Sequence, residues 1–591
     1  MSENLGLSPQ LINVQNRELI SLNGAWQTIV DPFENGFYNY RLEEADKGYF
    51  KDVDYSGDRS FLQEYDFNSA NELYVPGDWN TQRPQLYYYE GTVWYRKHFD
   101  YTKKSNKRVF LYFGAVNYEA IVYLNGEKIG RHIGGFTPFN IEVTNSIKQG
   151  VNSLVVKADN KRKPEAVPTV NADWWNFGGI TRHAYLVETP EVFVRDYHIQ
   201  LDKTNPKEIA GWVQLDGVNS QQQVKVTIPE LKLTQSVTTN EKGFAELRIP
   251  VKKLTYWNPE DPKLYEVNLT LNEQTLSDNI GFRIIATQGT DVLLNGKKIF
   301  LRGICIHEET AGNSARATTE ADAITLLTWA KELGCNFVRL AHYPHNENMI
   351  RTAERMGLMV WSEIPVYWTI YWSNPATYQN AEAQLADMIT RDRNRANVII
   401  WSVANETPLS DARLEFLKKL INKTREMDPT RLVSAAMEKE ELSPGLMTVH
   451  DPLSEYLDLI SFNQYIGWYD GTWEKCDRVN WQFSSNKPVV ITEFGGGALY
   501  GNSGDVHQYF TEEYQEELFV RTVNMFKRIP GLAGTTPWIL KDFRSPRRHI
   551  PLIQGEFNRK GLISDKGEKK KAFFVMQKWY DEIKANETKK N

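Results

Sequence analysis

Cysteine is scarce in this chain: its 591 residues include only Cys305, Cys335 and Cys476. These three are far apart and show neither a CxxC pair nor a Cys/His spacing suited to zinc. We therefore expect buried free thiols, with no disulfide framework and no structural zinc site. Long apolar runs are also missing, because no stretch approaches the ~18 residues that a membrane-spanning helix needs. The sequence gives no reason to expect a membrane as partner.

Charge of one sign is not in excess either. The net charge is −6 and the isoelectric point is near 6.0, which gives no electrostatic reason to expect nucleic acid as a partner. Gly134-Gly135 and the glycines at 495–497 lack the strand–loop–helix setting of a phosphate-binding loop. The first residues are polar and hold no basic-then-apolar leader. This fits a cytoplasmic protein or a periplasmic or secreted protein expressed without its signal peptide, and it leaves the compartment open.

Aromatic residues, by contrast, are plentiful: 17 Trp, 29 Tyr and 27 Phe. Their faces suit sugar rings, although they also fill large β-rich cores. A chain of 591 residues is too long for a single core and predicts about three or four domains.

The first two domains are predicted to be all-β. Residues 1–189 contain short alternating segments and the hairpin signal Asn125-Gly126. Residues 190–287 repeat the pattern on a smaller scale, which suits an immunoglobulin-type sandwich.

From residue 288 to residue 591 the pattern changes to strand–helix alternation. Thr319 with Asp322 marks a helix start, and Gly334 occupies the position of a C-terminal cap. Eight such strands over about 300 residues predict a (β/α)8 barrel, whose strand carboxyl ends carry the chemistry. The eight predicted strands are Ile299–Gly303, Asn336–Leu340, Leu358–Trp361, Val398–Trp401, Arg431–Ser434, Leu457–Ser461, Val489–Thr492 and Leu532–Thr536.

Two glutamates follow strands of this predicted barrel. The fourth strand leads through Ser402-Val403-Ala404 into Asn405-Glu406, and the seventh leads directly into Glu493. Glutamates at the ends of opposed strands can face one another across the barrel axis. Glycoside hydrolysis needs such a pair, one carboxylic acid to protonate the leaving oxygen and one carboxylate to attack the anomeric carbon. The competing interpretation, two glutamates on solvated loops, is disfavoured by the apolar flanking segments.

The strings WSVANE at 401–406 and ITEFG at 491–495 resemble the two catalytic signatures of glycoside hydrolase family two. The resemblance covers nearly the whole chain and implies a multidomain α and β protein. Its expected parts are a jelly-roll sugar-binding domain, an immunoglobulin-like sandwich and a C-terminal (β/α)8 TIM barrel. Further segments that carry it are Leu22–Trp26, Val75–Trp79, Trp94–Arg96, Gly134–Phe139, Asp173–Arg182, Arg302-Gly303, His307-Glu308 and Arg339 with His342-Tyr343-Pro344.

The resemblance also implies roles for individual residues. It implies a retaining, exo-acting β-glycosidase in which Glu406 is the acid/base and Glu493 the nucleophile. Asn405 would bond the substrate 2-hydroxyl and Tyr465 would lie near the nucleophile. The remaining substrate-binding candidates are Asp173, His307, His342, Tyr469, Trp538, Asn558 and Lys560. Taken without the resemblance, the two histidines are more readily explained as structural.

The sugar is indicated by the string Asn558-Arg559-Lys560-Gly561. It resembles the Asn-x-Lys element with which β-glucuronidases hold the C6 carboxylate, and a cation with a neutral donor suits two carboxylate oxygens. The sequence therefore favours a β-glucuronidase that acts on oligosaccharides or conjugates. Some β-galactosidases of the family share the string, so a β-galactosidase stays an alternative, and Lys560 could also be a surface lysine. A non-catalytic carbohydrate-binding protein is a more distant alternative.

Two features near the expected site bear on substrate size. About sixteen residues rich in aromatics, including Tyr367, Trp368, Tyr371 and Trp372, separate Glu363 from a helix expected to begin near Asn380. So short a loop suggests an open mouth and a preference for oligosaccharide ends. The arginines at 544, 547 and 548 could bind an anionic or sulfated extension, or could pair with acidic residues on the rim.

No cofactor or metal is expected, because the retaining mechanism needs none and no dense acidic ligand set is present. The sequence is compatible with a homo-oligomer but does not set the oligomeric state.

Overall fold

The computed structural model describes residues 6–52 and 65–590, and it starts with a sandwich of two antiparallel sheets. One sheet consists, in spatial order, of β1 (Glu18–Ser21), β10 (Ala184–Pro190), β5 (Lys107–Phe113) and β8 (Phe139–Glu142). The other consists of β3 (Asn71–Val75), β2 (Gly24–Asp31), β4 (Thr92–Tyr101), β9 (Gly150–Asp159), β6 (Glu119–Leu124) and β7 (Glu127–Ile133).

The predicted hairpin signal forms the turn between β6 and β7. Asn125 and Gly126 have φ angles of 53° and 83°, the left-handed conformation that a two-residue hairpin turn requires. The apolar side chains of the sandwich strands fill a core between the sheets that includes Trp26, Trp79 and Tyr95. Local turn chemistry and strand alternation therefore act together to shape this part of the chain.

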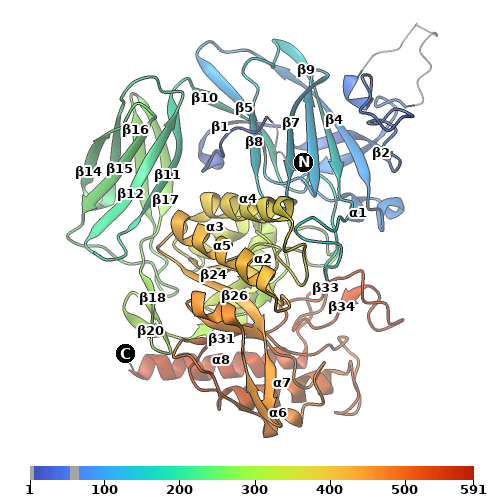
Figure 1. Cartoon of the computed structure of the whole chain (residues 1–591), viewed down its shortest axis with the longest axis vertical. Helices are drawn as coiled ribbons and strands as arrows, with labels where there is room; N and C mark the ends of the chain where they lie inside the picture. The colour runs from blue at the N-terminus through green and yellow to red at the C-terminus, as the bar shows by residue number, and fades with distance from the viewer. Residues whose placement is uncertain (1–5, 53–64, 591) are drawn as a thin grey trace.

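A second, smaller sandwich follows, in green in Figure 1. Strict alternation of exposed and buried residues along β15 shows how each strand turns one face inward. One sheet holds β11 (Phe193–Leu201), β12 (Glu208–Asp216) and β15 (Phe244–Pro250), and the other holds β14 (Leu233–Thr238), β13 (Gln223–Ile228), β16 (Tyr265–Leu271) and β17 (Gln274–Ile280). The immunoglobulin-like sandwich expected from the sequence is confirmed.

The rest of the chain forms a closed parallel sheet surrounded by helices. The strands at its two ends, β21 and β22, are separated by only Gly303 and Ile304, so the ring closes within one interrupted first strand. The strands follow in the order β21 (Leu301–Arg302), β32 (Leu532–Thr535), β31 (Val489–Glu493), β29 (Ile460–Asn463), β26 (Leu432–Glu438), β25 (Val398–Asn405), β24 (Met359–Glu363), β23 (Phe337–Leu340) and β22 (Cys305–Ile306). The TIM barrel is confirmed.

Helices cover the outside of this barrel. The first of them begins as predicted, with a capping box in which Thr319 accepts from the backbone N–H of Asp322, and it ends just before Gly334, whose φ is +92°. The helices are α2 (Glu320–Glu332), α3 (Glu347–Arg355), α4 (Pro375–Asp392), α5 (Asp411–Met427), α6 (Lys475–Arg478), α7 (Glu512–Phe526) and α8 (Lys571–Lys590). Within the residues described, no helix is both long and apolar enough to cross a membrane.

The helix expected near Asn380 begins earlier, at Pro375. Its start is set by Asn374, whose side chain accepts from the backbone N–H of Ala376, and by a proline at the first helical position. The preceding loop after β24 is therefore even shorter than the sequence suggested.

Both β-domains rest on the barrel (Figure 1). The first domain reaches the barrel through Arg182, which donates to Pro344 O at 2.7 Å and to Glu308 at 3.1 Å. The second reaches it through Arg283, which donates to Val398 O at 2.7 Å. The buried contacts of Arg182 fix the first domain beside the carboxyl ends of the barrel strands.

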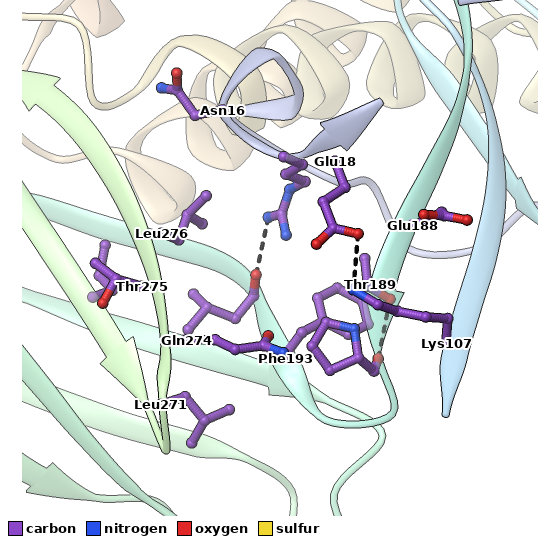
Figure 2. A pocket seen from close by; sticks show the side chains of 14 residues that line it. Asn16, Glu18, Lys107, Glu188, Thr189, Phe193, Leu271, Gln274, Thr275 and Leu276 are labelled. Carbon is purple, nitrogen blue, oxygen red and sulfur yellow. Dashed lines mark hydrogen bonds and ion pairs between the residues drawn. The ribbon is translucent and has the colours of Figure 1, made fainter. Parts of the chain in front are cut away.

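The two β-domains also meet each other, and a cavity of about 270 Å³ lies at their junction. Figure 2 shows Glu18 and Lys107 of the first domain bonded to one another on one side, with Leu271 and Leu276 of the second domain opposite. The residues that line this cavity belong to the two β-domains, so the cavity is separate from the barrel mouth.

Candidate active site

The two candidate glutamates lie at the carboxyl ends of β31 and β25, two barrel strands separated by β29 and β26. Glu493 is the last residue of β31 and Glu406 follows β25 directly. Both strands are buried along their whole length because helices cover them outside and side chains fill the barrel inside. Each glutamate therefore lies at the point where a buried strand reaches the mouth of the barrel.

Glu493 is buried and is held from both carboxylate oxygens. Arg339 donates from Nη1 to Oε1 at 2.7 Å, and Tyr465 donates its hydroxyl to Oε2 at 2.6 Å. His342 places Nε2 at 3.7 Å from Oε1. The carboxylate can thus keep one orientation, with one oxygen beside a fixed positive charge.

Arg339 connects Glu493 to the floor of the site. Its guanidinium is fully buried and donates to both oxygens of Glu363, at 3.0 and 3.1 Å, and to Asn405 Oδ1 at 2.7 Å. Burial alone would raise the pKa of the Glu363 carboxyl, but Arg339 and His342 outweigh it and lower that pKa to about 2. Glu363 therefore stays ionised and locks the arginine in place.

Glu406 has a different environment. Trp368 donates its indole N–H to Oε2 at 2.9 Å, and Asn463 donates its side-chain amide to Oε1 at 2.9 Å. Burial, with a further contribution from the negative charge of Glu493, raises the pKa of Glu406 to about 7. At neutral pH this carboxyl can hold a proton and release it, as a general acid and base must.

A second cluster of polar side chains lies near these glutamates. Asp173 of the first domain accepts from Asn558 at 3.2 Å and from Ser545 at 2.5 Å. Asn558 Oδ1 in turn accepts from the backbone N–H of Lys560 at 3.2 Å. Residues separated by more than 370 positions in the chain are thereby joined in one cluster.

Lys560 is a buried cation in this cluster. Its Nζ donates to the Tyr469 hydroxyl at 2.7 Å and lies 5.7 Å from the ring centroid of Tyr465. Across residues 6–52 and 65–590, no carboxylate forms an ion pair with it. A buried ammonium group without a counter-charge is costly, and an anionic ligand would provide that counter-charge.

Aromatic rings form one wall of the site. Trp538 stacks on His342 with ring centroids 4.8 Å apart, and His307 meets Trp538 edge-on at 5.2 Å. Burial, followed by the neighbouring His342, lowers the pKa of His307 well below its usual value, so its imidazole is neutral. Trp174 of the first domain packs against both histidines.

All eleven candidate residues therefore lie in one connected region. Glu406, Asn463, Asn405, Arg339 and Glu493 form a continuous hydrogen-bonded chain. From Glu493 the contacts continue to the other candidates, which are Tyr465, Tyr469, Lys560, Asn558, Asp173, His342, Trp538 and His307.

The short loop after β24 uses its four aromatic residues in different ways. Tyr367 is buried against Trp174, and Trp372 packs edge-on against Phe416. Trp368 is half-buried beside Glu406, and the Tyr371 side chain is 53% exposed. Two of the four, Tyr367 and Trp372, are thus occupied by the protein's own packing.

The three arginines near the strand-eight exit also differ. Arg548 forms an ion pair with Asp173, as the rim-pairing interpretation predicts. Arg544 instead donates to backbone oxygens of Ser314 and Asn313 and to the Tyr87 hydroxyl. Arg547 bonds Asn171 and lies over the Trp368 ring.

Four side chains that shape the site are not among the eleven candidates from the sequence: Arg339, Glu363, Trp368 and Asn463. Arg339, Glu363 and Asn463 lie at or next to the carboxyl end of β23, β24 and β29. A systematic list of polar residues at those strand ends would have found these three.

Among the described residues, no group of three or more His, Cys, Asp or Glu side chains is arranged to hold a metal ion.

Comparison with known proteins matches three successive parts of the chain to family descriptions. "Glycosyl hydrolases family 2, sugar binding domain" matches residues 19–190, "Glycosyl hydrolases family 2" matches 192–283, and "Glycosyl hydrolases family 2, TIM barrel domain" matches 285–585. A β-glucuronidase of Paenibacillus borealis is 28% identical over 561 residues, which cover 86% of this chain and 91% of that protein.

Solved structures share the whole fold. A Bifidobacterium dentium β-glucuronidase complexed with coumarin-3-O-glucuronide has a TM-score of 0.81 at 23% identity, covering 98% of this chain and 99% of that one. A β-galacturonidase from Eisenbergiella tayi bound to galacturonate has a TM-score of 0.79 at 24% identity, again covering 98% and 99% of the two chains. At these identities the likeness shows the fold alone.

Proposed function

Because the chain belongs to glycoside hydrolase family 2, we propose that it is a retaining, exo-acting β-glucuronidase. It removes terminal β-D-glucuronic acid from oligosaccharides or conjugates by double displacement. Glu406 and Glu493 at the mouth of the barrel support glycosidase chemistry. The polar cluster around Lys560 supports an acidic sugar as substrate.

In the first step Glu406 is the acid. Its proton passes to the glycosidic oxygen while a carboxylate oxygen of Glu493 forms a bond to the anomeric carbon, and the aglycone leaves as an alcohol. In the second step Glu406, now a carboxylate, takes a proton from water. The hydroxyl bonds to the anomeric carbon, the ester to Glu493 breaks, and the product keeps its β-configuration.

Several side chains are suited to position the sugar for these steps. Asn405 is buried and its Nδ2 has no hydrogen-bond partner within residues 6–52 and 65–590, so it can donate to the 2-hydroxyl. Tyr465 and Arg339 hold the attacking carboxylate. Trp538 and His342 form an aromatic wall beside the sugar pocket, and Asp173 provides an acceptor next to Asn558.

The observation that carries the choice of substrate is the buried charge of Lys560, which forms no ion pair with a carboxylate of the described residues. The C6 carboxylate of a uronic acid would supply the missing negative charge, and Asn558 would supply a neutral donor beside it. A β-galactoside offers no charge at C6 and would leave Lys560 uncompensated. A β-galacturonide carries the same carboxylate and differs only at C4, so it is the stricter comparison.

The experiment is a comparison of kcat/KM for the 4-nitrophenyl β-glycosides of glucuronic acid, galacturonic acid and galactose. We expect the glucuronide to be the best substrate. Lys560→Ala should lower the glucuronide-to-galactoside ratio by about 10- to 100-fold, since a hydrogen bond to a charged group is worth ~1.5–3 kcal/mol.

Lys419→Ala, which removes an exposed lysine of α5, is the matched control and should leave the ratio unchanged. Preference for the galactoside would refute the binding of a C6 carboxylate by Lys560 and Asn558, but not the roles of the two glutamates. Preference for the galacturonide would support that carboxylate binding and would show that the sugar is galacturonic acid. Turnover that survives in Glu493→Gln would refute the nucleophile assignment, and no turnover of any glycoside would favour a binding protein.

A further inference from the structure

Arg547 differs from the other two arginines of its segment. Arg544 uses its guanidinium on backbone oxygens and a tyrosine, and Arg548 is paired with Asp173. The Arg547 side chain is exposed, and among the residues that the structure describes its guanidinium bonds only Asn171, which is also exposed. No carboxylate in the described ranges forms an ion pair with Arg547, so its charge is available to a ligand.

The position of Arg547 relative to the catalytic pair is defined by Trp368. The guanidinium carbon lies 4.8 Å from the centroid of the Trp368 ring, a cation–π arrangement that limits the side chain's freedom. Trp368 is itself fixed at two points. Its backbone N–H donates to Asn405 O at 3.0 Å, and its indole N–H donates to Glu406 at 2.9 Å.

This geometry places Arg547 on the leaving-group side. Glu406 delivers its proton to the glycosidic oxygen, so the surface around Glu406 and Trp368 adjoins the sugar that departs. The group of Lys560 and Asn558 is joined instead to Asp173, with which Arg548 forms an ion pair. The two consecutive arginines thus contact different residues, Arg548 the Asp173 carboxylate and Arg547 the Trp368 ring beside Glu406.

We infer that Arg547, Trp368 and Asn171 form a leaving-group subsite for an anionic sugar, one that carries a carboxylate or a sulfate. The inference rests on the proposed function, which it extends from the cleaved sugar to its neighbour. A guanidinium presents a planar fork of N–H donors that matches either anion. The substrate class is therefore an acidic oligosaccharide with an uncapped β-uronic acid at its non-reducing end.

The test uses three disaccharides with the same β-linked glucuronic acid at the non-reducing end. The second sugar is neutral, carries a carboxylate, or carries a sulfate. In the wild type we expect at least one anionic disaccharide to have a higher kcat/KM than the neutral one, and this advantage to shrink as salt is raised, because exposed charges are screened. The anionic disaccharide with the higher kcat/KM shows whether the subsite prefers a carboxylate or a sulfate.

Arg547→Gln should lower the anionic-to-neutral kcat/KM ratio by about fivefold, the effect of one well-oriented exposed ion pair. Arg547→Lys should lower it less. Arg41→Gln is the matched control, since Arg41 is also exposed and lies over a ring, that of Tyr40 at 5.2 Å, in the first domain. This variant should keep the wild-type ratio.

Equal kcat/KM values for the three disaccharides in the wild type, or an Arg547→Gln ratio equal to that of the wild type, would overturn the inference. The 4-nitrophenyl β-glucuronide is measured in parallel and tests the proposed function by itself. Its cleavage without an anion preference overturns only the subsite. If the enzyme cleaves neither the 4-nitrophenyl β-glucuronide nor any of the three disaccharides, both the subsite and the proposed function are overturned.

Discussion

The indole Nε1 of Trp368 donates to Oε2 of Glu406 at 2.9 Å. This bond links the loop after β24 to the residue that follows β25, and it joins a hydrophobic ring to the group proposed as acid/base. The indole stabilises the charged form of the carboxyl, whereas burial and Glu493 stabilise the protonated form. The balance among these contributions sets the pH range in which Glu406 can act as an acid.

That balance gives a prediction on pH. With the pKa of Glu406 raised to about 7 by burial and then by Glu493, kcat/KM should fall as pH rises through about 7, because the acid loses its proton. Trp368→Phe removes a donor to the carboxylate, so the pKa of Glu406 should rise and the alkaline limb should move to higher pH. Tyr371→Phe, in the same loop, is the control; an unmoved limb in Trp368→Phe would contradict the prediction.

Replacing Glu493 should affect both activity and Glu406. Glu493→Gln removes the attacking oxygen, and we expect kcat to fall by ~10⁴-fold or more. The same change removes a negative charge near Glu406, so the pKa of Glu406 should fall below 7 but stay above 4.5, since burial persists. Titration of tryptophan fluorescence in Glu493→Gln, compared with Glu493→Gln/Glu406→Gln, measures that pKa. A pKa of Glu406 unchanged from the wild type would show that the two carboxylates do not interact.

Glu406→Ala should show a dependence on the leaving group. For a poor leaving group such as a sugar alcohol, kcat should fall by ~10²–10⁴-fold, because the alcohol cannot depart without a proton. For 4-nitrophenol the first step should suffer much less, because this group leaves as an anion. Added azide should replace water in the second step and give a β-glycosyl azide, detectable by NMR. An equal loss for both kinds of substrate, with no azide product, would contradict the role of Glu406.

Glu363 provides a prediction on stability. Glu363→Gln leaves the buried Arg339 with one carboxylate fewer, and the free energy of unfolding at pH 7 should fall by about 3 kcal/mol, the lower end for a broken buried pair. The pKa of Glu363 is lowered to about 2 in the folded protein. Its contribution is therefore fully present above pH ~4.5 and is lost as pH falls toward 2.

Urea denaturation at several pH values tests this. The gap between wild type and Glu363→Gln should be constant above pH ~4.5 and should narrow below it. Glu415→Gln, which breaks an exposed pair with Lys419, should cost less than ~1 kcal/mol at any pH. A gap that widens in acid would mean that Glu363 is protonated in the folded state.

Much of the fold could be predicted because its signals are local. The turn at Asn125-Gly126 depends on two residues that accept positive φ, and the start of α2 depends on a capping box spanning four residues. α4 begins five residues before the position expected from the sequence, because Asn374 caps it and Pro375 occupies its first turn. Barrel topology predicts that the candidates at strand ends share one mouth, whereas the approach of Asp173 from the first domain depends on domain packing.

Local patterns are enough to show which segments become strands and helices, and hence that Glu406 and Glu493 stand at strand ends, because alternation and capping act over a few residues. Which side chains meet depends instead on the packing of distant segments. Asp173 reaches Asn558 across 385 positions, and Arg339 of β23 joins Glu363, Asn405 and Glu493 from three other strands. The burial that raises the pKa of Glu406 also exists only once the barrel and the first domain have packed together, since desolvation is a property of the assembled surroundings.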